Sequence, residues 1–173
     1  MSVLSVRDLE VTYKTQAGPI PAVRGVSLDI DPGEVLGLAG ESGCGKSTVV
    51  NAILRLLPAG TTVSGEVLLN GEDVLMMKPG RLRAVRWTGA SVVFQGAMHA
   101  MNPVQRIGDQ LAEAIVLHGQ AGEKEALVRV GDLLEQVGMP PRRLRDYPHE
   151  LSGGQKQRVM IAMALACSPS LVI

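Results

Sequence analysis

The spacing of apolar side chains predicts strands in the N-terminal third of the chain and helices in much of the rest. Leu4–Val11 alternates loosely between apolar and polar positions, which is typical of a half-exposed strand. Glu34–Ala39 is apolar after its first residue, and this predicts a strand buried on both faces, as in a parallel sheet covered by helices. The same criteria predict further strands at Ala22–Ile30, Gly65–Asn70, Ala90–Phe94 and Leu171–Ile173, and helices at Lys46–Leu57, Pro79–Trp87, Val104–His118, Glu123–Val137 and Gly153–Cys167.

Clusters of glycine and proline predict where these elements end. Gly18–Pro21 predicts a turn between the first two strands, and Asn70-Gly71 predicts another. Strands and helices alternate along much of the chain, but two helices follow each other directly between residues 104 and 137. We therefore expect a helical insertion in an α/β core. The expected single domain has a β region and core at 1–95, a helical subdomain at 96–150, and the last helix and strand at 151–173.

The composition is that of a folded protein, and it excludes several classes. The 173 residues suffice for one domain, and 46% hydrophobic with 20% charged residues argues against disorder. Seventeen basic and seventeen acidic residues cancel, so no long-range field attracts nucleic acid or anionic lipid. Aromatic residues make up only 2%, which argues against a stacking platform for single-stranded nucleic acid.

Cysteine usage and hydropathy indicate the compartment. The two cysteines lie far apart without metal-ligand spacing, which suits a reducing environment. The longest apolar stretch, Val159–Cys167, is about half as long as a membrane span, and Met1–Glu10 lacks the pattern of a signal peptide. We therefore expect a cytosolic chain that is soluble when isolated.

A glycine-rich segment between the predicted strand at 34–39 and the predicted helix at 46–57 fits the pattern G-x-x-x-x-G-K-[ST]. Glycines let successive backbone N–H groups surround an anion, and the helix adds its positive N-terminal end. Lys46 should reach the β- and γ-phosphates, and the Ser47 hydroxyl should bind Mg²⁺. The alternative is a strand-to-helix turn that binds nothing. It is disfavoured because the motif lies where a phosphate-binding loop is expected, with a predicted strand before it and a predicted helix after it. The expected nucleotide-binding residues are Gly40, Glu41, Ser42, Gly43, Cys44, Gly45, Lys46, Ser47 and Thr48.

Cys44 needs separate treatment, because a thiol in a loop can be a nucleophile. No histidine lies near it in the sequence to act as a base. We interpret it as a small loop residue, although a reactive one beside the phosphate-binding amides.

A second glycine-rich segment opens the last predicted helix and consists of Leu151, Ser152, Gly153, Gly154 and Gln155. A serine, two glycines and a helix N-terminus suit phosphate binding, but an ordinary N-cap by Ser152 would look the same. A match to all five residues is expected by chance on the order of once per 10⁴ chains of this length. The same chain also contains the glycine-rich loop at Gly40–Ser47. The two motifs together favour phosphate binding over an ordinary N-cap for the second segment.

With both segments, the chain resembles the ATP-binding subunits of ABC transporters over its whole length. Gly40–Ser47 corresponds to the family's Walker A loop and Leu151–Gln155 to its signature. The resemblance implies a P-loop NTPase core with an antiparallel N-terminal β region and a helical subdomain. It also implies that Tyr13 lies against the adenine, and that Gln95 contacts Mg²⁺ and senses the transmembrane partner.

Three segments resemble the dipeptide, oligopeptide and nickel importers more closely. One departure is Gly96-Ala97, where that branch commonly has an acidic residue and a proline. His149 precedes the signature, and we interpret it as a packing or capping group. The three segments are Gly40–Thr48, Met101–Pro103, and Tyr147–Leu151 together with Val159–Leu165.

The resemblance implies function and partners. In the family, MgATP hydrolysis drives transport, here uptake of peptides or nickel. Two such domains, in a homodimer or a heterodimer, pack head to tail, so Ser152–Gln155 of one closes over the nucleotide held by Lys46 of the other. The expected further partners are transmembrane permease subunits, and no nucleic acid is expected as a partner. The subunit itself is expected at the cytoplasmic face of the cell membrane, as a peripheral protein.

Family members continue after a strand like Leu171–Ile173 into an Asp that orients Mg²⁺, a Glu that activates water and a switch His. None of these is in the 173 residues, and neither Glu41 nor Glu150 is placed to replace them. We therefore expect an incomplete sheet at the C-terminus and a catalytically incomplete fragment of a longer subunit.

Two alternatives stay open. The first is an ABC ATPase of DNA repair or chromosome organisation, which ranks low because the segment between Gln95 and Ser152 is compact and the net charge is zero. The second is a fragment that binds nucleotide without hydrolysing it.

Overall fold

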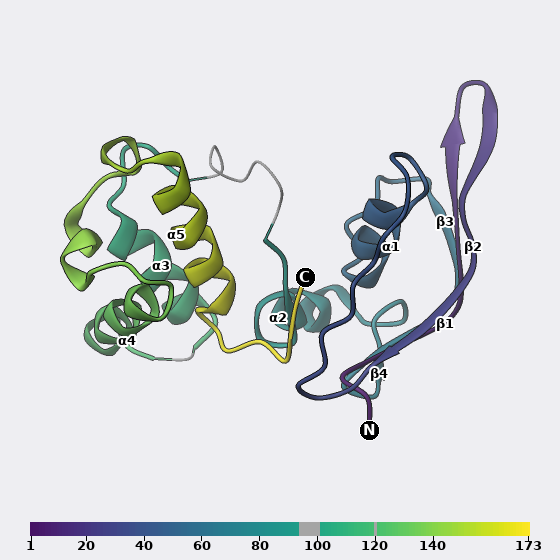
Figure 1. The fold of residues 1–173 in the computed structure, drawn as a ribbon. Helices are drawn as coiled ribbons and strands as arrows, with labels where there is room; N and C mark the ends of the chain where they lie inside the picture. Colours follow the sequence, from purple (N-terminus) through teal and green to yellow (C-terminus); the bar gives the residue numbers. More distant parts are fainter. Residues whose placement is uncertain (94–100, 120) are drawn as a thin grey trace. The chain divides into compact units, whose positions relative to one another are not determined.

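The computed structural model describes residues 1–93, 101–119 and 121–173. These residues form two compact units, Met1–Gly89 and Ala90–Ile173, and Figure 1 traces both along the chain. The predicted boundary at residue 95 lies outside the described residues. The second unit contains both the predicted helical subdomain and the last helix.

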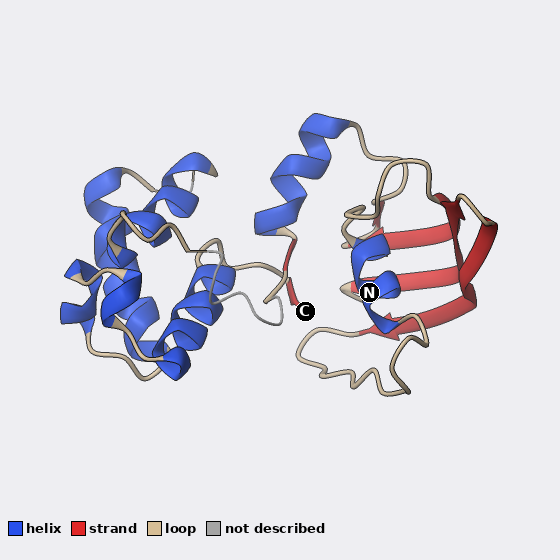
Figure 2. Ribbon diagram, turned by 90° about the horizontal axis from the view of Figure 1, so that it is seen from above, coloured by secondary structure: helices blue, strands red, loops and turns tan. Residues whose placement is uncertain are grey.

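The first unit is built on a four-stranded antiparallel sheet in the order β2-β1-β3-β4, drawn in red in Figure 2. The long central strand β1 pairs with β2 on one side and β3 on the other, so its backbone is satisfied along both edges. The strands are β1 (Leu4–Thr15), β2 (Gly18–Ile30), β3 (Thr62–Leu69) and β4 (Glu72–Asp73).

A bulge in β1 explains why its apolar residues alternate only loosely. Leu4 and Val6 are buried, and so are Leu9 and Val11, so the period slips by one residue between the two pairs. The register of β1 against β3 shifts at this point. Gly65 lies opposite the bulge with φ at 94°, and a Cβ there would lie 2.5 Å from the Asp8 carbonyl oxygen. The bulge therefore keeps both apolar pairs in the core, and it requires a glycine across from it.

Two helices complete the first unit. The helix α1 (Lys46–Ile53) buries Val49, Ala52 and Ile53, and both ribbon views place it alongside the sheet. The helix α2 (Pro79–Thr88) buries Leu82 and Val85. Because α1 begins directly after the glycine-rich loop, its packing against the sheet positions that loop.

The second unit is mainly helical. Apolar residues at helical spacing fill its core, among them Leu111 and Ile115 from α3, Leu134 from α4 and Val159 from α5. A short parallel pair of strands, β5 and β6, links its first and last residues. Its elements are β5 (Ala90–Ser91), α3 (Ile107–Leu117), α4 (Glu123–Gln136), the 3₁₀ helices η2 (Pro141–Arg145) and η3 (Pro148–Glu150), α5 (Gly153–Leu165) and β6 (Leu171–Val172).

The prediction of a buried strand at Glu34–Ala39 is wrong. The segment has no strand structure, and Val35 is 94% exposed. The physical reason is the lack of a strand partner, because no strand that the structure describes pairs with this segment. An apolar run without a neighbouring ladder has no place for its backbone hydrogen bonds.

The predicted turn at Gly18–Pro21 is also misplaced. The turn falls at Gln16-Ala17, and β2 already begins at Gly18. Pro19 and Pro21 lie within β2, opposite Lys14 and Thr12. This is possible because β2 is an edge strand, where a missing N–H removes no bond to a further strand.

The other predicted elements are present with small changes at their ends. The helix α1 ends at Ile53 instead of Leu57, and Phe94 lies outside the described residues. Among the helices that the structure describes, none has the length and apolar character needed to cross a membrane.

Candidate nucleotide-binding site

The loop before α1 depends on glycine at its last position. Gly45 is the N-cap of α1 with φ at 99°, a conformation that favours glycine. A Cβ at this position would lie 2.6 Å from the carbonyl oxygen of Ala22 in β2. Both backbone conformation and available space therefore require a residue without a side chain.

The N-terminus of α1 is open to an anion. Gly45 provides no side-chain cap, and the first turn contains no acidic residue. The first intrahelical bond runs from the Val49 N–H to the Gly45 carbonyl at 3.0 Å. The N–H groups of the first turn have no carbonyl partner within the helix, which is the arrangement that binds phosphate in other proteins.

The Lys46 side chain folds back across its own loop. Its ammonium nitrogen donates to the carbonyl oxygens of Gly40 at 2.7 Å and Glu41 at 2.6 Å. It also lies 3.3 Å from the Cys44 sulfur. These three acceptors match the three protons of an ammonium group. A phosphate could replace these neutral acceptors with an anionic one, so that both partners of the hydrogen bond carry a charge.

Tyr13 is brought to this loop from β1. Its hydroxyl donates to the Thr48 hydroxyl oxygen at 3.2 Å, which links the sheet to the first turn of α1. Thr48 is buried, whereas Ser47 is exposed at the start of the helix. The structure therefore gathers Tyr13, Lys46, Ser47 and Thr48 at one end of α1. The Tyr13–Thr48 contact is one that the sequence motifs did not indicate.

The second glycine-rich segment forms the N-terminus of α5 in the other unit. The Gln155 N–H donates to the Ser152 hydroxyl oxygen at 3.4 Å, and the Ser152 N–H donates to the Gln155 side-chain oxygen at 2.9 Å. Leu151 is buried, and Gly153 and Gly154 are exposed. The ordinary N-cap is therefore present. It uses one lone pair of the serine and leaves the hydroxyl proton able to donate to a phosphate.

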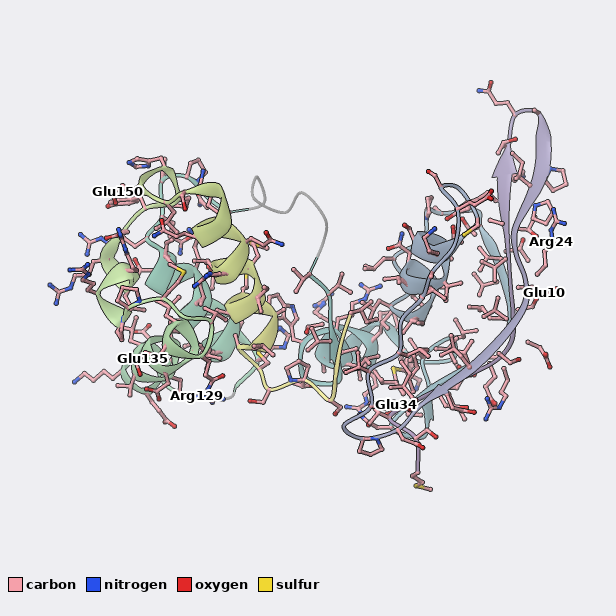
Figure 3. The ribbon with its side chains drawn as sticks, viewed as in Figure 1. Glu10, Arg24, Glu34, Arg129, Glu135 and Glu150 are labelled. Atoms are coloured by element: carbon pink, nitrogen blue, oxygen red, sulfur yellow. The ribbon has the colours of Figure 1, made fainter. Side chains whose placement is uncertain are left out.

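The residues before this segment pack against one another. The rings of Tyr147 and His149 are stacked with centroids 5.7 Å apart, in agreement with the packing role expected for the histidine. Glu150, labelled in Figure 3, accepts a hydrogen bond from the Tyr147 N–H at 2.7 Å. Its carboxylate caps the short helix η3, which is a structural role.

Gln95 and the departure at Gly96-Ala97 lie outside the described residues. Among the residues that are described, no group of three or more His, Cys, Asp or Glu side chains could hold a metal ion. A Mg²⁺ ion bound with ATP takes most of its ligands from phosphates and water, so it needs few protein oxygens. The exposed Ser47 hydroxyl beside the open helix end fits this demand.

Comparison with known proteins decides the family. Residues 23–173 match the sequence profile of the ABC transporter family. The chain belongs to this family. The predicted family and the predicted P-loop NTPase fold class are confirmed.

Individual ABC proteins are similar over nearly the whole chain. The probable peptide ABC transporter ATP-binding protein y4tR of Sinorhizobium fredii is 46% identical over 175 residues, which cover 99% of this chain and 52% of that protein. The dipeptide transport ATP-binding protein DppD of Bacillus subtilis is 42% identical, with 99% and 52% covered. The chain thus spans about half the length of these curated relatives.

The fold is shared with a solved ABC cassette. The dimeric structure of MJ0796, described as a bacterial ABC transporter cassette, superposes with a TM-score of 0.84 at 29% identity. The match covers 98% of this chain and 72% of that chain. A second structure of MJ0796, in a post-hydrolysis state, is bound to ADP and Pi and has a TM-score of 0.81 at 26% identity, with the same coverage.

Proposed function

We propose that this chain binds MgATP as the nucleotide-binding part of an ABC importer for peptides. The observation that carries the proposal is the Lys46 ammonium held over a glycine-rich loop at the open N-terminus of α1. The names of the relatives, which include peptide and dipeptide transport proteins, support the substrate class. In the whole protein, ATP hydrolysis would be coupled to uptake.

Each part of the nucleotide has a proposed partner. The phosphates bind the backbone N–H groups at the loop and the first turn of α1, and Lys46 turns from its loop carbonyls to the β- and γ-phosphates. Ser47 and Gln95 are the proposed protein ligands of Mg²⁺, which when bound neutralises charge on the phosphates. The adenine stacks on the Tyr13 ring.

The proposed partners follow the family's arrangement. A second ABC subunit, identical or different, presents the segment Leu151–Gln155 to the nucleotide held at Lys46. The dimeric structure of the MJ0796 cassette supports the pairing of two such subunits. Transmembrane permease subunits would hold the pair at the cytoplasmic face of the membrane.

Replacing Lys46 tests the proposed nucleotide site. Lys46→Ala removes the one ammonium at the loop, and we expect MgATP affinity to fall roughly 100-fold or more, since hydrogen bonds to charged groups contribute most at such sites. The matched control is Lys124→Ala, which removes an exposed lysine from α4 in the other unit. Isothermal titration calorimetry with ATP and Mg²⁺ gives both affinities. Equal binding by the two variants would contradict the proposal.

A further inference from the structure

The thiol of Cys44 and the amine of Lys46 form a close pair within the loop. The sulfur lies 3.3 Å from the ammonium nitrogen. The carbonyls of Gly40 and Glu41 hold the nitrogen in that place. The sulfur also lies against the Gly40 backbone, because a Cβ on Gly40 would be 2.7 Å from it. Two groups able to bond covalently are thus held next to each other before any nucleotide arrives.

The pair is open to small oxidants, whereas the other cysteine is not. Cys44 is an exposed free cysteine. Cys167 is only 2% exposed, and its thiol donates a hydrogen bond to the Ala114 carbonyl oxygen at 3.5 Å. Burial raises the pKa of the Cys167 thiol, which disfavours the reactive thiolate. Of the two cysteines, Cys44 is therefore the one that a peroxide should oxidise.

We propose that a peroxide converts Cys44 and Lys46 into a reversible sulfenamide crosslink that switches off nucleotide binding. In the first step the Cys44 sulfur attacks hydrogen peroxide, so a sulfur–oxygen bond forms, the oxygen–oxygen bond breaks and one water leaves. The sulfur is oxidised to a sulfenic acid and the peroxide is reduced. In the second step the Lys46 nitrogen attacks the sulfur, so a sulfur–nitrogen bond forms and the sulfur–oxygen bond breaks. The oxygen leaves as a second water with one proton of the ammonium, and a further proton goes to solvent.

The crosslink would block the site, because it consumes the ammonium group and ties the side chain to the loop. A thiol reductant would restore both groups, since two thiols become a disulfide as the sulfur–nitrogen bond is reduced. Bound MgATP should protect the pair by drawing Lys46 towards the phosphates. This effect on binding rests on the proposed nucleotide site, whereas formation of the crosslink does not.

Peptide mapping tests the crosslink without nucleotide. Trypsin cleaves after Arg24, Lys46 and Arg55 in the unmodified protein. After treatment with hydrogen peroxide we expect an uncleaved Gly25–Arg55 peptide about 2 Da lighter than its sequence mass, because two hydrogen atoms are lost. Dithiothreitol should return normal cleavage. Normal cleavage after Lys46 in the treated protein, or Cys44 carrying only added oxygen, would overturn the proposal.

Two variants and a binding measurement complete the test, each protein being compared with its own untreated sample. Cys44→Ser cannot form the crosslink, whereas Cys167→Ala should form it like the natural protein. We expect peroxide to weaken ATP binding at least tenfold in Cys167→Ala and to leave Cys44→Ser unchanged; an equal loss in both would overturn the switch. If the crosslink forms in a protein that never bound ATP, the crosslink stands and the proposed nucleotide site fails.

Discussion

Tyr13 shows how one side chain can serve both the fold and the proposed site. Its hydroxyl bonds to Thr48 at 3.2 Å, and its ring is half-buried at the end of β1 nearest the loop. The hydroxyl therefore anchors the first turn of α1. The remaining face of the ring is the part proposed to stack on adenine.

Two substitutions at Tyr13 separate these roles. Tyr13→Phe removes the hydrogen bond but keeps the ring, so we expect a slightly less stable protein with nearly unchanged ATP affinity. Tyr13→Ala also removes the ring, and we expect ATP affinity to fall by about 1 to 3 kcal/mol, the range of base–aromatic stacking. Calorimetry with MgATP measures both affinities. If the Phe variant loses as much affinity as the Ala variant, the hydroxyl matters and stacking does not.

The glycines of the loop permit a prediction about backbone geometry. Gly45→Ala meets both a φ of 99° and a carbonyl oxygen 2.6 Å from the new Cβ, so we expect a loss of about 3 kcal/mol in the free energy of unfolding. Gly43 has φ at 82° but no atom within 4 Å of a Cβ. Gly43→Ala should therefore cost only about 1 kcal/mol. Urea unfolding measures both, and equal losses would show that the contact with Ala22 is unimportant.

At the level of elements, the sequence predicted the helices, which depend on the local spacing of apolar residues. It did not predict which segments pair as strands. The helices α3 and α4 bury one face each, so their spacing of apolar residues predicted them within a few residues. Glu34–Ala39 failed because a strand also needs a neighbour, which apolar character does not supply. The prolines of β2 led to the wrong position for the first turn. An edge strand tolerates proline, and only the order of strands in the sheet shows that β2 is an edge strand.

The same division holds for the candidate site. The pattern of Gly40–Thr48 was visible in the sequence because spacing and residue type define it. The bond from Tyr13 to Thr48 was not, since it depends on how β1 packs against α1. The contact between Lys46 and Cys44 was not visible either, because it depends on the fold of the lysine side chain.

The helix α1 is short, and a side chain of α2 holds its far end. Arg86 donates to the carbonyl oxygens of Leu54 at 2.9 Å and Arg55 at 2.7 Å, just after the last residue of α1. Carbonyls at a helix C-terminus lack partners within the helix, and a cation there also suits the helix dipole. Arg86 thus stabilises the helix that carries Lys46 at its opposite end.

Replacing Arg86 should loosen α1. We expect Arg86→Ala to lower the free energy of unfolding by about 2 kcal/mol, because two hydrogen bonds from a charged donor are lost. Arg83→Ala, at an exposed position of the same helix, should change it by less than about 0.5 kcal/mol. Chemical unfolding followed by circular dichroism measures both. Similar values for the two variants would show that Arg86 does not support α1.

For the molecule as a whole, the two glycine-rich segments belong to different units and have different surroundings. The loop at Gly40–Gly45 leaves a helix end without a side-chain cap, whereas Ser152 caps its own helix. The first can hold an anion alone. The second is already satisfied, so a phosphate brought by another subunit would add to the cap and not replace it. This difference fits the proposed head-to-tail pair, in which each subunit would bind one nucleotide and close over the nucleotide of its partner.

Ser152→Asp tests that pairing. Aspartate is also a good N-cap and suits the helix dipole, so the variant should be as stable as the natural protein and bind MgATP normally. Its carboxylate would repel the γ-phosphate held by the partner, so we expect MgATP-dependent association of two subunits to be lost. Ser152→Ala, by contrast, loses the cap and about 1 kcal/mol of stability. Sedimentation velocity with and without MgATP measures association, and an Asp variant that still pairs would show that Ser152 only caps α5.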